Sequence, residues 1–113
     1  MKLSQITNYS DHPSEHAQKL LNGKNHRVIA NNTKMWGSGG YARVELHGHS
    51  IIQIQPYVGV QLYSCGYRTV TTKDRMNRFL PNGTRVFQKD HVWYLTDYLG
   101  TRRFHDGIKV RFP

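Results

Sequence analysis

The feature that most constrains the fold of this chain is the alternation of apolar and polar residues between positions 41 and 64. In the segment YARVELH, the residues Ala42, Val44 and Leu46 occupy every second position, which is the spacing of a strand with one buried face. The segments SIIQIQ and YVGVQLYS alternate in the same way. Their inward positions are Ile52, Ile54, Val58, Val60 and Leu62. Short connections separate the three segments, so the pattern predicts an antiparallel meander.

Segments on both sides of the meander extend the predicted sheet. RVIANNT precedes it, and TRVFQKDHVWYL and GIKVRF follow it. A chain of 113 residues can close one modest core, so we expect a single domain. We predict an α+β fold in which residues 25–113 form an antiparallel sheet of about five or six strands with a short helix packed on it.

Two short helices complete the predicted fold. The helix on the sheet spans Thr72 to Leu80, where Thr71 or the first residue itself can cap the N-terminus and Pro81 ends the helix. Its buried stripe is Met76, Phe79 and Leu80. The other helix lies in an N-terminal arm of residues 1–24 and begins near Pro13, a residue that suits a first turn.

The composition favours an anionic partner. Lys and Arg total 16 residues against 7 Asp and Glu, which gives a formal net charge of +9 with His neutral. This charge attracts polyanions, so nucleic acid or an acidic protein is the expected partner. Cys65 is the only cysteine, which excludes an internal disulfide and with it a stapled secreted fold. The sequence shows neither an apolar membrane span nor the core of a signal peptide, so we expect a cytoplasmic protein with no membrane partner.

The segment from Gly66 to Lys89 concentrates the positive charge, with six cations and one acid. Cations neutralise phosphates, and aromatic rings stack on exposed bases. We therefore predict non-enzymatic nucleic-acid binding through Arg68, Lys73, Arg75 and Arg78. The predicted stacking partners are Tyr57, Tyr63 and Tyr67, whereas Phe79, Phe87 and Trp93 are expected in the core. A solvated helix surface is the alternative interpretation of the four cations.

Several strings along the chain resemble a family of small proteins encoded in phage and prophage genomes. The strings are NNT, VELHGHSI, GYRTVTTKDRMN, VFQKDHVWYL and FHDGIKV, and the most distinctive pattern among them is GYRT-x-TTKDR-x-N. The resemblance extends over roughly residues 28–110. It implies a viral origin and an accessory role in the cytoplasm of the host cell. It implies no particular activity, so no catalytic residue is assigned.

Two other interpretations are consistent with the sequence. A basic aromatic surface also suits an acidic groove on a host enzyme, which the protein would then inhibit or modulate. The third interpretation is a metal- or histidine-dependent nuclease. His47 and His49 would share a face if both lay on one strand, and His91, His105 or Cys65 would complete the site. No glycine-rich phosphate motif occurs and no cofactor is expected, while exposed strand edges leave room for a homo-oligomer.

Overall fold

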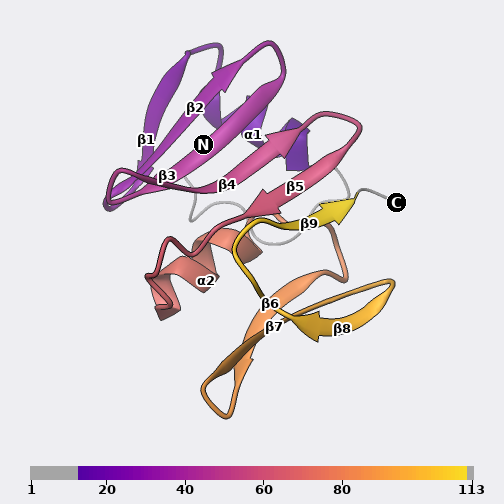
Figure 1. The fold of residues 1–113 in the computed structure, drawn as a ribbon. Coiled ribbons are helices and arrows are strands. Elements are labelled where there is room, and N and C mark those ends of the chain that lie inside the picture. Colours follow the sequence, from indigo (N-terminus) through magenta and orange to yellow (C-terminus); the bar gives the residue numbers. More distant parts are fainter. Residues whose placement is uncertain (1–12, 112–113) are drawn as a thin grey trace.

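The computed structural model describes residues 13–111 as two short helices and nine strands (Figure 1). The helix α1 (Pro13–Leu21) precedes five consecutive strands, and α2 (Val70–Asn77) separates these from the last four. The strands are β1 (His26–Ala30), β2 (Thr33–Ser38), β3 (Tyr41–Leu46), β4 (His49–Gln55), β5 (Gly59–Leu62), β6 (Arg85–Lys89), β7 (Val92–Asp97), β8 (Gly100–Arg103) and β9 (Ile108–Arg111). No helix in this part of the chain is long and apolar enough to cross a membrane.

Six of the strands form one antiparallel sheet in the order β1-β2-β3-β4-β5-β9. The predicted meander is its centre, where β3, β4 and β5 pair consecutively. The inward residues of these strands are buried as expected, with one exception. Val58 is 58% exposed because β5 begins only at Gly59, so that Val58 belongs to the preceding connection. The prediction that Val58 faces the core is therefore wrong.

Helix α1 covers the inner face of this sheet and lies behind the strands in Figure 1. Its residues Ala17, Leu20 and Leu21 belong to the same core as the inward residues of the strands. A Cβ atom at Gly37 in β2 would collide with Cδ1 of Leu21, so the glycine lets the helix approach the strand closely. The first twelve residues of the predicted N-terminal arm lie outside the described residues.

The strands β6, β7 and β8 form a second antiparallel sheet. Helix α2 holds it in place, because the amide of Asn77 donates to the Val86 carbonyl oxygen at 2.9 Å and accepts from the Val86 N–H at 2.8 Å. The amide thus takes the place of a neighbouring strand at one edge of β6. The predicted stripe of Met76, Phe79 and Leu80 is buried with Trp93 in the common core.

The bounds of α2 differ from the predicted range of Thr72 to Leu80. Thr69 is the N-cap, and its Oγ1 accepts a hydrogen bond from the Thr72 N–H at 3.1 Å. Thr72 is fully buried inside the first turn and does not cap the helix. The chain offers threonines at three nearby positions, and only packing decides which of them caps. At the other end the helix stops at Asn77, with Arg78 as the C-cap, and Pro81 disfavours helical geometry only in Leu80.

The predicted antiparallel sheet, single domain and two short helices are confirmed, because both sheets and both helices contribute to one core. The protein is nevertheless mainly β, with nine strands in two sheets rather than about five or six in one. Alternation along a segment identifies a strand but not the sheet that it joins. Strand β9 illustrates this. The chain leaves the second sheet after β8, and β9 then pairs with β5 in the first sheet.

Candidate nucleic-acid interface

The arginines of α2 have partners within the protein. Arg75 donates from Nε to the hydroxyl of Thr33 at 3.0 Å and from Nη1 to the carboxylate of Asp74 at 2.7 Å. Arg78 pairs with the same carboxylate at 3.1 Å. Because Thr33 belongs to β2, the first of these bonds ties α2 to the six-stranded sheet. The Arg75 side chain is only 16% exposed, so its main role is to stabilise the fold and little of it is accessible to a ligand.

Arg68 and Lys73 converge over the buried ring of Trp93. The guanidinium carbon of Arg68 lies 5.5 Å from the centroid of that ring and 5.2 Å from the ring of Phe104. The Lys73 Nζ lies 5.6 Å from Trp93 and donates to the Gln88 side chain at 3.1 Å. Cations attract the electron-rich face of an aromatic ring, so both contacts favour the folded arrangement.

The three predicted tyrosines lie in two connections between elements. Tyr57 is fully exposed in the connection between β4 and β5, with a positive φ of 64°. Tyr63 follows β5, and its ring lies near Gly107. Tyr67 precedes α2, and its ring centroid is 5.2 Å from that of His49. Among the described residues, no two of these three rings contact each other, so they do not form one stacking platform.

The histidines do not form the predicted pair on one strand. His47 lies in the two-residue turn that joins β3 to β4, with a φ of 52°, whereas His49 begins β4. His91 lies in the turn before β7, and His105 lies in the connection after β8. Within residues 13–111, no three His, Cys, Asp or Glu side chains gather in a way that would hold a metal ion.

Asp106 fastens the connection that leads from β5 to α2. Its carboxylate accepts from the Ser64 N–H at 2.8 Å, from the Ser64 hydroxyl at 2.6 Å and from the Cys65 N–H at 3.2 Å. Burial opposes ionisation of this carboxyl, but the hydrogen bonds and the nearby charge of Arg68 outweigh it, so the pKa of Asp106 is lowered. Burial and the Asp106 charge raise the pKa of the Cys65 thiol, which is the opposite of what a nucleophilic cysteine needs.

The outward face of the three-stranded sheet carries a cluster that the sequence reasoning missed. Pairing places Phe87 opposite Tyr94, and Tyr94 opposite Arg103. The two rings stack with centroids 5.6 Å apart and planes inclined by 26°, and both side chains are half-buried. Alternation along β6 puts Arg85 and Lys89 on the same face as Phe87. These residues define the small-sheet face: Arg85, Phe87, Lys89, Tyr94 and Arg103.

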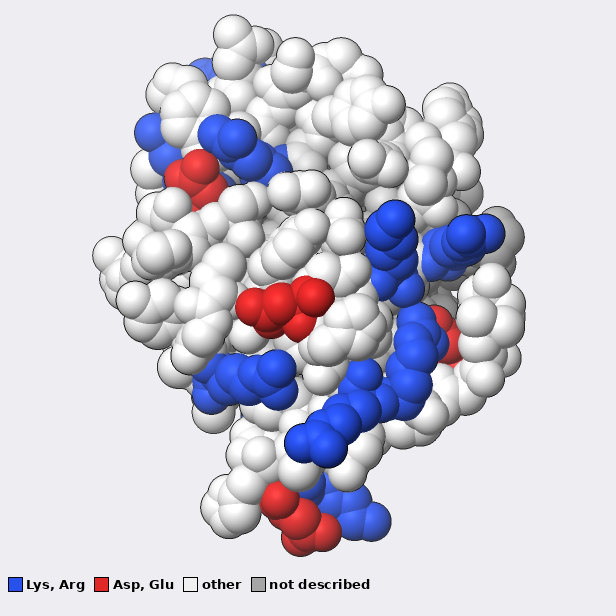
Figure 2. Space-filling view, in the orientation of Figure 1, with Lys and Arg blue, Asp and Glu red and all other residues white. Residues whose placement is uncertain are grey.

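The three cations of the small-sheet face have no partner within the described residues. Arg85, Lys89 and Arg103 are exposed, and none of them makes a hydrogen bond, an ion pair or a ring contact there. The outward positions of β6, β7 and β8 carry no Asp or Glu, and the Asp97 carboxylate on the other face of β7 is paired with Arg102 at 2.9 Å. Figure 2 shows Lys and Arg side chains gathered over β9 and the three-stranded sheet.

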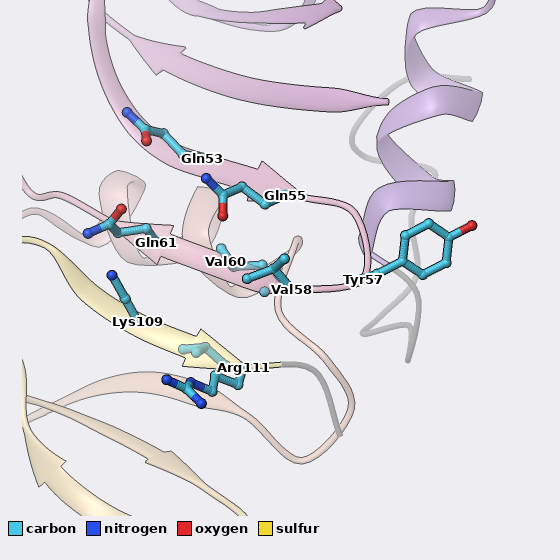
Figure 3. Close-up of a pocket in the computed structure, with 10 residues that line it drawn as sticks. Gln53, Gln55, Tyr57, Val58, Val60, Gln61, Lys109 and Arg111 are labelled. Atoms are coloured by element: carbon cyan, nitrogen blue, oxygen red, sulfur yellow. The ribbon is translucent and has the colours of Figure 1, made fainter. Parts of the chain in front are cut away.

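A hollow of about 410 Å³ opens on the outer face of the six-stranded sheet, over β4, β5 and β9. Two cross-strand rows shape it. The first row is Gln53, Gln61 and Lys109, and the second is Gln55, Gly59 and Arg111. Figure 3 shows the glutamine, lysine and arginine side chains on three adjacent strands, whereas the ring of Tyr57 points away from them. A second hollow of about 420 Å³ shares Gln53 and Gln55 and continues towards Trp36.

One signal in the sequence points to the small-sheet face. Arg85, Phe87 and Lys89 alternate with residues of the opposite face, where Val86 is buried. This spacing marks an outward set of two cations and one aromatic ring. We predict Phe87 in the core because aromatic residues dominate small cores, and that prediction is wrong, since Phe87 is half-buried. The predictions of buried Phe79 and Trp93 are confirmed.

Comparison with known families and structures gives one match. Residues 13–111 match the family model described as Kyanoviridae Gp96 protein. No curated protein and no solved structure matches the chain. The matched range contains every helix and strand of the structure, and it confirms the resemblance to a phage protein family.

Proposed function

The chain belongs to the Kyanoviridae Gp96 family of phage proteins, and we propose that it binds single-stranded nucleic acid through the small-sheet face. The observation that carries this proposal is the stacked pair of Phe87 and Tyr94 among three exposed cations whose side chains have no partner in residues 13–111. A single strand offers bases and phosphates side by side. Aromatic rings bind the first and cations bind the second, so the small-sheet face supplies both kinds of contact.

The availability of the cations favours this face over α2. A cation that already holds an intramolecular partner must give up that contact before it can neutralise a phosphate. Arg85, Lys89 and Arg103 have no such side-chain contact to give up within the part of the chain that the structure describes. Phosphate binding also releases counterions from the nucleic acid, which makes the affinity fall as the salt concentration rises.

The stacked rings favour a single strand over a duplex. Paired bases stack on one another and present only their edges in the grooves, whereas an unpaired base has an open face that can stack on a ring. The best candidate for insertion into a groove is α2, and its arginines are held by Asp74 and Thr33. The three-stranded sheet is therefore the better match to an unpaired strand.

Fluorescence anisotropy with labelled single- and double-stranded oligonucleotides, measured at several salt concentrations, tests the proposal. The variant Arg85→Gln/Lys89→Gln removes two charges from the small-sheet face. The variant Lys19→Gln/Lys24→Gln removes two exposed charges whose side chains likewise have no partner among the described residues. We expect the wild type to prefer the single strand. The first variant should reduce the slope of log affinity against log salt by about 1.4, since each phosphate contact contributes about 0.7 for a single strand. The control variant should keep the wild-type slope.

The same measurement contains the result that would overturn the proposal. Equal slopes for the two double variants would mean that only net charge matters, and the small-sheet face would not be the site. Absence of binding at low salt would exclude nucleic acid and favour the host-protein interpretation. That interpretation then requires that the chain captures one defined host protein and that this complex persists after nuclease treatment. The Tyr94→Leu variant should no longer capture that protein.

A further inference from the structure

The hollow over β4, β5 and β9 has the composition of a ligand site on a second face of the molecule. We propose that it binds a single nucleotide, with the base on the amides of Gln53 and Gln55 and the phosphate on Lys109 and Arg111. A volume of about 410 Å³ lies within the range of small-molecule sites in proteins. The inference goes beyond the proposed function, because the hollow lies on the six-stranded sheet and shares no residue with the small-sheet face.

Gly59 lets the two strands that line the hollow approach each other closely. It stands between Gln55 and Arg111 in its cross-strand row, and its backbone is buried. A Cβ atom there would collide with the carbonyl oxygen of Val110 and would lie 3.0 Å from the Cα of Arg111. The close approach of β5 and β9 thus requires glycine at this position, and it brings Lys109 and Arg111 of β9 beside the glutamines of β4 and β5.

The glutamines supply the chemistry that recognises a base. Each amide offers a donor and an acceptor, which is the pairing that base edges present. The side chains of Gln53 and Gln55 make no hydrogen bond within the described residues. Gln61 is oriented by its donation to the Gly107 carbonyl oxygen at 2.9 Å, which leaves its Oε1 as an acceptor. An apolar ligand would leave these amide groups unpaired, so the hollow suits a polar planar ligand.

The cations at one side of the hollow favour a ligand that carries a negatively charged group. Lys109 and Arg111 both come from β9, and neither has a partner within the described residues. Among the described residues, no Asp or Glu lines the hollow, so none of them repels a phosphate there. A nucleotide joins a base to a phosphate and matches both halves of the site, whereas a nucleoside or an inorganic phosphate matches only one.

Heteronuclear NMR of the full chain tests this proposal through the side-chain amides of the three glutamines. The probes are the four common nucleoside monophosphates, with adenosine and inorganic phosphate as half-ligands. We expect a monophosphate to shift the amide signals of Gln53 and Gln55 and to bind at least about tenfold more tightly than either half-ligand, because it makes both sets of contacts at once. The ligand of the hollow can be a free nucleotide or a nucleotide within a nucleic-acid strand. A short oligonucleotide added to the Arg85→Gln/Lys89→Gln variant distinguishes these two ligands. It shifts the glutamine amide signals only if the hollow accepts a nucleotide within a strand.

Two variants make the result decisive. Arg111→Gln should weaken monophosphate binding about tenfold and leave adenosine binding unchanged, while Tyr98→Ala, which removes an exposed ring between β7 and β8, should leave both unchanged. Inorganic phosphate that binds as tightly as a monophosphate would reduce the hollow to an anion site and overturn the proposal. Unshifted glutamine amides would overturn it as well. The variant Arg85→Gln/Lys89→Gln should bind the monophosphate like the wild type. This result makes the test of the hollow independent of the test of the small-sheet face.

Discussion

Helix α2 and the small-sheet face carry similar numbers of cations in very different surroundings. Arg75 and Arg78 share the carboxylate of Asp74, and Lys73 lies over Trp93. Arg85, Lys89 and Arg103 have no such partners within the described residues. A run of positive charge in a sequence therefore does not show which charges are available to a ligand. In this protein the run beginning at Arg68 is divided between cations that support the fold and cations that remain exposed.

The largest effect is expected where the two regions are joined. Asn77 of α2 makes both of its amide hydrogen bonds to the backbone of Val86 in β6. Asn77→Ala would leave two backbone groups of a buried residue without partners and should lower the free energy of unfolding by about 2–3 kcal/mol. Denaturant unfolding measures this value. Asn82→Ala, at an exposed position, is the control and should change it by less than about 0.5 kcal/mol. Equal effects would show that the amide does not hold the second sheet.

A slightly smaller difference should separate the arginines of the two regions. Arg75→Met removes the bonds to Thr33 and Asp74 while keeping most of the apolar stem, and we expect a loss of about 1–2 kcal/mol in the free energy of unfolding. Arg85→Met removes an exposed charge and should cost less than about 0.5 kcal/mol. Chemical denaturation of both variants under one buffer condition makes the comparison. If Arg85→Met proved the more destabilising, the assignment of roles to the two regions would be reversed.

The sequence predicts most of the sheet and little of its grouping. Ala42, Val44 and Leu46 are buried as their spacing requires, because a half-buried strand leaves a period of two in the chain. The division into two sheets is set by contacts between distant segments, such as β9 with β5 and Asn77 with Val86. Neither contact leaves a periodic trace, so neither is visible in the sequence alone.

A third prediction concerns Asp106, whose lowered pKa links stability to pH. A carboxyl with a lower pKa in the folded state contributes stability above its unfolded pKa of about 3.9, and that contribution is lost as the pH falls through the folded pKa. Asp106→Asn removes the charge and one acceptor and should cost about 1 kcal/mol at neutral pH. Unfolding curves at a series of pH values should show this cost shrinking in acid. The exposed turn residue Asp90 gives the control Asp90→Asn, and a cost for Asp106→Asn that stays constant with pH would contradict the assignment.

The proposed binding surface is harder to predict from the sequence than the fold. The four predicted cations and three tyrosines are close in the chain, but the structure distributes them over α2, the ring of Trp93 and two separate connections. The small-sheet face depends on the register that sets Phe87 opposite Tyr94 and Tyr94 opposite Arg103. Register across a hairpin is fixed by its turn and by packing, so it can be read only from the structure.

The smallest expected effect tests the comparison most directly, because it changes one charge at a time in the binding assay. Arg85→Gln should lower the salt slope for a single-stranded oligonucleotide by about 0.7, the contribution of one phosphate contact. Arg78→Gln removes the same charge from a residue paired with Asp74 and should leave the slope unchanged. Both substitutions change the net charge equally, so general attraction between protein and nucleic acid cancels between them. A lower slope for Arg78→Gln alone would return the interface to α2, where the charge pattern of the sequence first placed it. A lower slope for both would mean that the bound strand contacts the two regions together, and that the ion pair with Asp74 opens on binding.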